Sequence, residues 1–102
     1  MELSQEDAGH TRRVRVGENV TIVLPESPTT GYRWEADVDA DVLPLVSDEY
    51  DGGAHPVGAG GTRRLTFAPA RPGPATLHLV KRRAWEGAAV GEFAVTLDVT
   101  PG

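Results

Sequence analysis

The sequence predicts an all-β domain, an antiparallel β-sandwich of seven to eight strands. Apolar residues alternate with polar ones in short runs, which is the period of a half-buried strand. Glycine and proline interrupt these runs at intervals of about ten residues, a spacing typical of all-β domains. No stretch repeats its apolar residues with a helical period. Two sheets packed face to face are the simplest arrangement that buries all of these apolar faces.

The length of 102 residues fits one domain with a single hydrophobic core. We expect residues 1–10, which are polar and acidic, to form a flexible N-terminal tail. Residues 11–102 are expected to form the sandwich domain. The tail contains no apolar signal segment, so the chain as given predicts a cytoplasmic protein. A secreted or periplasmic location would follow if a signal peptide had been removed.

The charge and composition exclude several classes of function. Fifteen acidic and ten basic side chains give a net charge of −5, which argues against a nucleic-acid binder. No apolar run approaches the ~20 residues of a membrane-spanning helix, so no membrane partner is expected. The chain has no cysteine, which excludes thiol nucleophiles and cysteine metal sites. We expect no cofactor and a monomeric protein.

Three strands are expected in the first part of the chain. The first, around Val14 and Val16, is short and edge-like, and the turn at residues 17–19 follows it. The second covers residues 20–24 and the third residues 32–38. The residues expected on the inward faces of the second and third strands are Val20, Ile22, Leu24, Tyr32, Trp34, Ala36 and Val38. Trp34 is expected near the middle of the core.

Asp37, Asp39 and Asp41 follow the third strand and suggest a calcium loop. A twelve-residue calcium loop needs glycine at its sixth position and glutamate at its twelfth. Counted from Asp37, those positions hold Val42 and Asp48. The sequence therefore favours a solvated acidic turn over a metal site.

Four further strands are expected in the second part. Residues 42–50 predict a weak edge strand, because Pro44 interrupts it. Residues 62–68, 75–80 and 93–99 alternate clearly, and residues 69–74 form a tight connection. The inward residues are expected to be Leu65, Phe67, Ala75, Leu77, Leu79, Phe93, Val95, Leu97 and Val99.

If successive strands run antiparallel, alternate connections lie at the same end of the sandwich. The second, fourth and sixth connections are residues 27–31, 51–61 and 82–87, and these are the most unusual in the chain. The strand count therefore predicts that all three gather at one end. Several arginines lie nearby in sequence, and a solvated strand face is the ordinary place for some of them: Arg33, Arg63, Arg64, Arg82 and Arg83.

The first of these connections is a shaped turn with two threonines, Thr29 and Thr30, at its tip. Pro28 fixes φ and Gly31 permits positive φ. Taken alone, it could be an ordinary connection between strands. The last connection holds Trp85 outside any alternating pattern, next to arginine. An exposed tryptophan of this kind is typical of binding hot spots, although the ring could also fold back over the sandwich.

The gathered end has none of the motifs of an enzyme. No serine stands in a Gly-x-Ser-x-Gly turn, and the histidines lack metal-ligand spacing. The glycines at residues 58–61 are not followed by the Lys-Ser/Thr of a phosphate loop and lead into a strand. The sequence therefore favours a binding protein, with no catalytic residues.

Three motifs resemble those of one known family, the chagasin-like inhibitors of papain-like cysteine proteases. The first, at residues 27–34, is similar to that family's Asn-Pro-Thr-Thr-Gly-Phe/Tyr-x-Trp, residues 58–61 to its Gly-x-Gly-Gly, and residues 83–85 to its Arg-Pro-Trp. The resemblance covers roughly residues 12–100. It implies an immunoglobulin-like sandwich whose three loops together block the active-site cleft of a papain-like cysteine protease.

The resemblance also implies which residues contact the protease, with Thr29, Thr30 and Gly31 entering the cleft. The full set expected at the interface is Ser27, Pro28, Thr29, Thr30, Gly31, Tyr32, Gly58, Ala59, Gly60, Gly61, Arg83 and Trp85. A wedge of this kind excludes substrate and needs no catalytic group of its own.

Two departures from the family pattern concern the loops. Ser27 stands in place of the family's asparagine, and Ala84 in place of its proline. Serine supports a turn more weakly than asparagine, and alanine removes a φ restraint. Both changes predict weaker or differently selective inhibition. They also keep an alternative open, a non-inhibitory recognition or adhesion module that binds another protein through the same loops.

Overall fold

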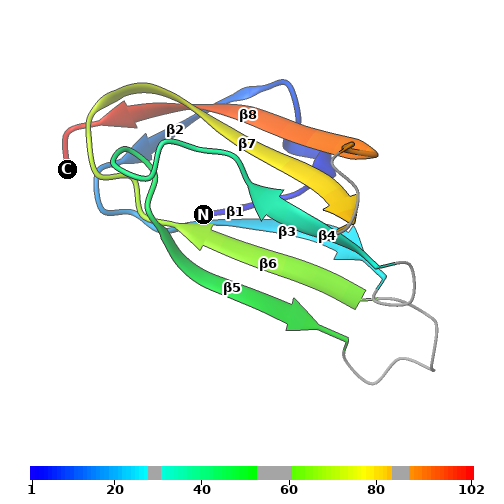
Figure 1. Cartoon of the computed structure of the whole chain (residues 1–102). Coiled ribbons are helices and arrows are strands. Elements are labelled where there is room, and N and C mark those ends of the chain that lie inside the picture. Colours follow the sequence, from blue (N-terminus) through cyan, green and yellow to red (C-terminus); the bar gives the residue numbers. More distant parts are fainter. Residues whose placement is uncertain (28–30, 53–60, 84–87) are drawn as a thin grey trace.

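The computed structural model describes residues 1–27, 31–52, 61–83 and 88–102. They form two four-stranded sheets packed face to face (Figure 1), in the orders β1-β3-β6-β5 and β2-β8-β7-β4. The fold class expected from the sequence is thus confirmed. The strands are β1 Glu2–Leu3, β2 Thr11–Arg15, β3 Val20–Glu26, β4 Tyr32–Ala36, β5 Leu45–Asp51, β6 Gly61–Phe67, β7 Gly73–Arg83 and β8 Gly91–Thr100.

The core lies between the sheets and is built from alternate residues of the strands. Along β3, β6 and β8 the burial pattern alternates residue by residue, as the apolar alternation of the sequence predicts. Phe67 and Phe93, one from each sheet, are the largest side chains with almost no exposed surface. Trp34 is buried in the same cluster, and its indole Nε1 donates a hydrogen bond to the Pro25 carbonyl at 3.0 Å. The prediction that Trp34 is a core residue is confirmed.

Two strand pairs are parallel, whereas the sequence predicted antiparallel sheets. β1 runs parallel to β3, and β2 runs parallel to β8. The chain passes from one sheet to the other between β1 and β2, so each of these strands is added at the outer edge of a sheet whose inner pairs are antiparallel. Hydrophobic alternation carries no information about strand direction, so it could not reveal this.

The first ten residues, expected as a flexible tail, contain a short strand and a single 3₁₀ turn, Gln5–Asp7. The Leu3 side chain is buried in the core. The N-terminal amino group donates to the Asn19 carbonyl at 3.0 Å, and Arg12 pairs with Asp7 at 2.8 Å. The boundary of the domain at residue 11 stays a prediction.

The edge strand β5 begins three residues later than expected, at Leu45. Before it, the amides of Val42 and Leu43 donate to the Asp39 carbonyl, and the Asp39 side chain accepts from the Asp41 amide. The backbone is therefore held in a turn up to Pro44, which follows buried Leu43. The exposed aspartates of this segment form the acidic turn that the sequence favoured.

Strand β7 is longer than expected and includes Lys81, Arg82 and Arg83, which the sequence assigned in part to a loop. These residues pair in register with Trp34, Arg33 and Tyr32 of β4. Aromatic rings of β4 lie against two of these cations: Lys81 Nζ is 5.7 Å from the centre of the Trp34 ring, and the Arg83 guanidinium stacks on Tyr32. Cross-strand stacking thus extends a strand that its charged sequence does not suggest. No helix in the described part of the chain is long and apolar enough to cross a membrane.

Candidate functional site

Three connections join strands whose ends lie at the same end of the sandwich, on the right of Figure 1. We call residues 27–31, between β3 and β4, the first loop; residues 52–60, between β5 and β6, the second loop; and residues 84–90, between β7 and β8, the third loop. The first loop passes from one sheet to the other, whereas the second and third each join neighbouring strands of one sheet. The strand ends therefore confirm the predicted gathering of these connections.

Five of the predicted binding residues are described, and all five are half-buried at or beside strand ends. They are Ser27, Gly31, Tyr32, Gly61 and Arg83. The other predicted binding residues lie outside the described residues: Pro28, Thr29, Thr30, Gly58, Ala59, Gly60 and Trp85. A binding role for any of the twelve stays a prediction.

Two of the described residues are glycines for different physical reasons. Gly31 has φ of +77°, in the left-handed region that residues with a Cβ rarely adopt. At Gly61 the constraint is space, since a Cβ atom there would overlap the Asp51 carbonyl oxygen and lie 2.6 Å from the Tyr50 hydroxyl. Glycine is therefore required at the end of the first loop and at the end of the second.

Tyr32 and Arg83 face each other across β4 and β7, where the first and third loops meet the sandwich. The two residues are register partners, and the Arg83 guanidinium carbon lies 4.2 Å from the centre of the Tyr32 ring. This is close stacking of a planar cation on an aromatic face. The contact fixes the end of the first loop to the start of the third.

A buried ion pair lies at the strand ends next to the first and second loops. Glu26, at the end of β3, and Arg63, near the start of β6, are 4% and 7% exposed. The guanidinium donates to both carboxylate oxygens, with the shortest contact, from Nη2 to Oε1, at 2.6 Å. The Arg63 Nη1 atom also donates to Asp48 of β5 at 3.0 Å, and the guanidinium lies 5.4 Å from the centre of the Tyr50 ring.

The surroundings of Glu26 determine its charge state. Burial, the largest single influence, raises the pKa of a carboxyl group. Hydrogen bonds from Arg63 and from the Trp34 backbone amide, together with the charge of Arg63, outweigh burial, so the pKa of Glu26 lies below its ordinary value. The hydrogen bonds that Arg63 donates to Glu26 raise the pKa of Arg63 in turn. Both groups are therefore ionised at neutral pH.

The sequence interpretation missed this pair, although the signal was present. Glu26 continues the inward positions of Val20, Ile22 and Leu24, and Arg63 continues those of Leu65 and Phe67. Two opposite charges at inward positions of two strands predict a buried ion pair only once the strands are known to be neighbours. The arginine cluster was expected to point in several directions, and Arg64 indeed lies on the other face, 2.8 Å from Glu2.

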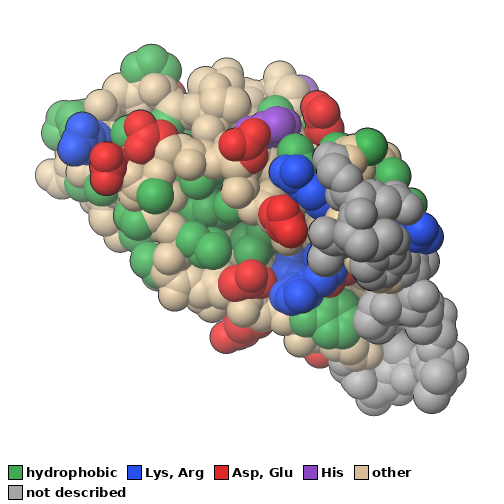
Figure 2. Space-filling model, in the orientation of Figure 1, with side chains coloured by type: hydrophobic (Ala, Val, Ile, Leu, Met, Phe, Trp, Pro, Cys, Tyr) green, Lys and Arg blue, Asp and Glu red, His purple; other side chains and the backbone are tan. Residues whose placement is uncertain are grey.

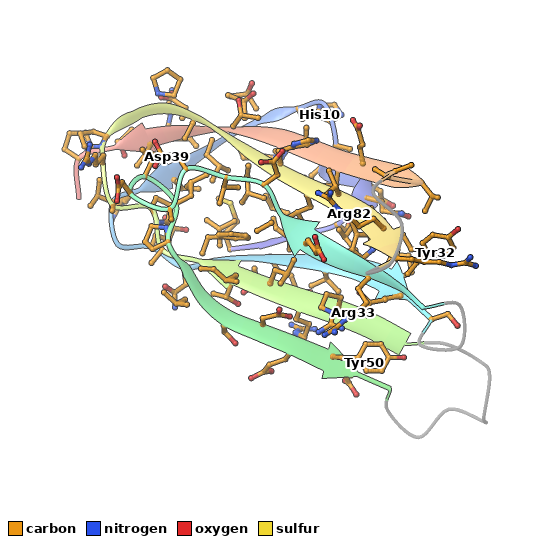
Figure 3. The ribbon with its side chains drawn as sticks, in the orientation of Figure 1. His10, Tyr32, Arg33, Asp39, Tyr50 and Arg82 are labelled. Carbon is orange, nitrogen blue, oxygen red and sulfur yellow. The ribbon has the colours of Figure 1, made fainter. Side chains whose placement is uncertain are left out.

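A hollow of about 340 Å³ opens beside the ion pair, between the ends of the first and second loops. It is lined by Glu26, Gly31, Tyr32, Arg33, Tyr50 and Arg63. Figure 3 shows the labelled Tyr32, Arg33 and Tyr50 in the loop-bearing half of the molecule, with Asp39 near the opposite end. The hollow has one exposed cation, Arg33, at its rim.

Charged side chains gather next to the loops on the face seen in Figure 2, with Lys and Arg interleaved among Asp and Glu. Arg82 lies 3.3 Å from Glu35, and Arg63 is paired as described above. Much of the positive charge at this end is thus compensated locally. In the described part of the chain no group of three His, Asp or Glu side chains is placed to hold a metal ion.

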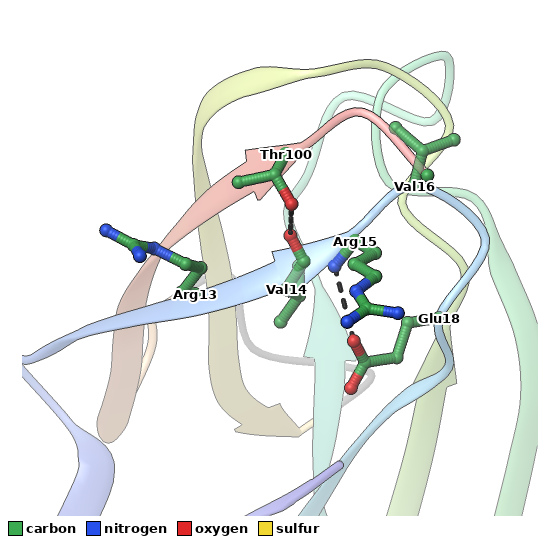
Figure 4. Close-up of a pocket in the computed structure, with 7 residues that line it drawn as sticks. Arg13, Val14, Arg15, Val16, Glu18 and Thr100 are labelled. Carbon is green, nitrogen blue, oxygen red and sulfur yellow. Dashed lines mark hydrogen bonds between the residues drawn. The ribbon is translucent and has the colours of Figure 1, made fainter.

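A larger open hollow, of about 730 Å³, lies at the opposite end of the sandwich (Figure 4). It is lined by the edge strand β2 and the turn after it, and by the C-terminal residues. Its polar groups are used within the fold: the Arg15 amide donates to Glu18 at 3.2 Å, and the Thr100 hydroxyl donates to the Val14 carbonyl at 3.1 Å. It contains none of the predicted binding residues.

Comparison with known proteins finds one family and a consistent fold. A family model described as "Chagasin family peptidase inhibitor I42" matches residues 13–99. Amoebiasin-1 of Entamoeba histolytica is 31% identical over 88 residues, which cover 83% of this chain and 84% of that protein.

Two solved structures have the same fold. The crystal structure of the cysteine protease inhibitor EhICP2 from Entamoeba histolytica superposes with a TM-score of 0.88 at 23% identity, covering 97% of this chain and 94% of that one. A structure described as PbICP-C in complex with falcipain-2 superposes with a TM-score of 0.63 at 14% identity, covering 99% of this chain and 98% of that one.

Proposed function

The chain belongs to the chagasin family of peptidase inhibitors, and we propose that it inhibits papain-like cysteine proteases by placing its three loops in the active-site cleft. The family match, which extends over residues 13–99, carries this proposal. Strands within that range bring the three loops to one end of a rigid sandwich, which supports a common binding surface.

The proposed mechanism is exclusion of substrate. In it, Thr29, Thr30 and Gly31 enter the cleft beside the catalytic residues of the protease, where the small side chains fit and the hydroxyls meet polar groups. The second and third loops contact the cleft walls on either side. The sandwich holds the loop ends before binding, which lowers the cost of ordering them, and a complex of this kind would bury about 1,600 Å² in total.

Titration against papain and a cathepsin tests the proposal. We expect residual peptidase activity to fall to zero as the protein is added, with competitive kinetics, because loop and substrate occupy the same cleft. Full activity at micromolar protein would refute inhibition of this class of enzyme. Capture of a partner that is not a protease, by the same loops, would then favour the recognition-module alternative.

Trp85 is the residue we expect to contribute most from the third loop. Replacing it by alanine should weaken inhibition by at least ~2 kcal/mol, about thirtyfold in the inhibition constant, as is typical of a tryptophan hot spot. The measurement is the inhibition constant of Trp85→Ala against papain. Val46→Ala, at an exposed position of β5, is the control and should inhibit like the parent protein. An unchanged constant for Trp85→Ala would show that the ring does not contact the protease.

A further inference from the structure

The ends of the three loops are joined by side-chain contacts and by the backbone of β4. Arg63, the third residue after the second loop, donates hydrogen bonds to Glu26, the last residue before the first loop. It also bonds to Asp48 and covers Tyr50 on β5, the strand that leads into the second loop. A single buried guanidinium therefore connects three strands of one sheet.

Glu26 extends this set of contacts into the other sheet. Besides Arg63, its carboxylate accepts a hydrogen bond from the Trp34 backbone amide at 2.9 Å. Glu26 precedes the first loop in one sheet, and Trp34 follows it in the other. The carboxylate thus holds the two ends of the first loop together across the sandwich, and the Trp34 indole bond to Pro25 supports it.

The third loop joins through Tyr32, which lies between the first loop and Trp34 on β4. Arg83, the last residue before the third loop, stacks on the Tyr32 ring at 4.2 Å. Tyr32 and Trp34 belong to the same strand, so β4 connects the Glu26–Trp34 hydrogen bond to the residue that precedes the third loop. We use the term loop clasp for the four residues Glu26, Arg63, Trp34 and Tyr32.

Stability alone is a weak reason for a buried ion pair. Removing two charges from water is costly, and replacing such a pair by apolar residues often leaves stability unchanged or improves it. Here the pair interrupts an otherwise apolar row of inward residues at the loop-bearing end of two strands. Directional bonds to Trp34 and Asp48 fix geometry in a way that apolar contacts cannot.

We propose that Glu26 and Arg63 are positioning residues for inhibition: their ion pair fixes the separation of the loop ends and so presents the three loops in binding geometry before the protease arrives. The inference rests on the proposed function. Neither side chain needs to touch the protease. If the pair is weakened, the loops lose conformational entropy when they bind the protease, and this cost weakens inhibition.

The test compares Glu26→Gln with Val14→Ala. Glutamine keeps the shape and an acceptor for the Trp34 amide but removes the charge. Val14 is 1% exposed on β2, beside the hollow at the opposite end, so its truncation lowers stability without contact with the loop clasp. The melting temperature of each variant is measured. Its inhibition constant against papain is then determined well below that temperature. We expect at least a tenfold rise in the inhibition constant for Glu26→Gln and a change below twofold for Val14→Ala.

Arg63→Lys is the second variant, for use also if Glu26→Gln does not fold. Lysine keeps the positive charge but loses the planar fork that reaches Glu26 and Asp48 together. We expect its inhibition constant to lie between those of the parent and of Glu26→Gln. The proposal would be overturned if the inhibition constants of both variants lay within twofold of the parent value. It would also be overturned if inhibition weakened only in proportion to the loss of melting temperature, by the same relation as in Val14→Ala.

A second readout separates failure of the positioning role from failure of the proposed function. Amide hydrogen exchange at Gly31, Trp34 and Gly61 is followed in the protein alone. Faster exchange at these three amides in Glu26→Gln, but not in Val14→Ala, is expected whether or not papain is inhibited. Absence of inhibition by the parent protein would refute the proposed function, and unchanged exchange in Glu26→Gln would refute the positioning role.

Discussion

Gly61 is a glycine whose surroundings leave no room for a side chain. A methyl group there would lie under 3 Å from the Asp51 carbonyl and from the Tyr50 hydroxyl, on the strand paired with it. Backbone cannot yield as a flexible side chain can, so β5 and β6 would have to separate. The close approach holds the two ends of the second loop together.

We therefore predict that Gly61→Ala lowers the free energy of unfolding by about 1–3 kcal/mol, the usual range for overpacking. Gly91→Ala is the matched control, because a Cβ at Gly91 makes only an ordinary contact, 3.5 Å from Lys81 Cβ. Urea denaturation of both variants checks the prediction. Equal stabilities would contradict the tight approach of β5 and β6 at Gly61.

Gly31 allows a separation of stability from inhibition. Its φ of +77° should cost about 1–2 kcal/mol when alanine is introduced. Gly17, with φ of +86° in the turn between β2 and β3, should suffer a similar loss on substitution. We expect Gly31→Ala to weaken inhibition of papain at least tenfold and Gly17→Ala to leave it unchanged. Only Gly31 belongs to one of the three loops proposed to bind the protease. An equal loss of inhibition in both variants would indicate that inhibition depends on overall stability and not on the conformation of Gly31.

At the scale of elements, the Glu26–Arg63 pair joins β3 to β6 and should make this part of the sandwich sensitive to acid. The pKa of Glu26 is lowered in the folded protein, so the pair contributes stability fully above the unfolded-state pKa of about 4.3 and loses it as the pH falls through the folded-state value. The carboxylate of Asp7, whose pKa is lowered chiefly by its bond from the Ser4 amide, acts in the same direction.

We predict that the free energy of unfolding falls less between pH 7 and pH 3 in Glu26→Gln than in the parent protein. Urea denaturation at both pH values measures it. Asp7→Asn should flatten the dependence separately, because its ion pair with Arg12 lies outside the loop clasp. If the free energy of unfolding depended on pH identically in the parent and in Glu26→Gln, the pKa of Glu26 would be the same in the folded and unfolded states.

The strands most fully predicted from the sequence are those with one buried face. In β3, β6 and β8 every second side chain enters the core, so the alternation itself encodes the element. β1 has only two residues, and its pairing with β3 depends on distant contacts. The end of β7 was missed because its stabilising partners, Tyr32 and Trp34, lie on another strand.

The position of the candidate site at one end of the sandwich was predictable once the strands had been recognised. Counting strands was enough to bring the three loops to one end. The ion pair between Glu26 and Arg63 could not be predicted, because its recognition requires the register of β3 and β6. In that register Leu24 lies opposite Arg63, and Glu26 lies opposite Gly61. Register is a property of two strands together and is not carried by either sequence run alone.

At the scale of the whole molecule, the β1-β3-β6-β5 sheet ends on both sides in strands that discourage further pairing. The edge strand β5 carries Asp48, Glu49 and Asp51, and β1 is very short. Charged and short edge strands prevent sheets from joining between molecules. The net charge of −5 adds mutual repulsion.

We predict a monomer by sedimentation velocity at low ionic strength and at physiological salt. Glu49→Val should promote self-association, because it removes a charge from the exposed edge next to Leu45 and Val46, which are 44% and 54% exposed. Glu18→Val, in the turn between β2 and β3, is the control and should remain monomeric. A stable dimer of the parent protein would contradict this view of its edges.

The first loop starts in one sheet and ends in the other, and this has a consequence for redesign. A change of spacing or a slight rotation between the two layers must alter the distance that the loop spans, even if no loop residue is touched. Core substitutions that exchange large and small side chains between Phe67 and its neighbours in the opposite sheet would therefore change which proteases are inhibited, without altering any loop residue. In a library that varies only interior residues, inhibitory spectrum and thermal stability should vary independently.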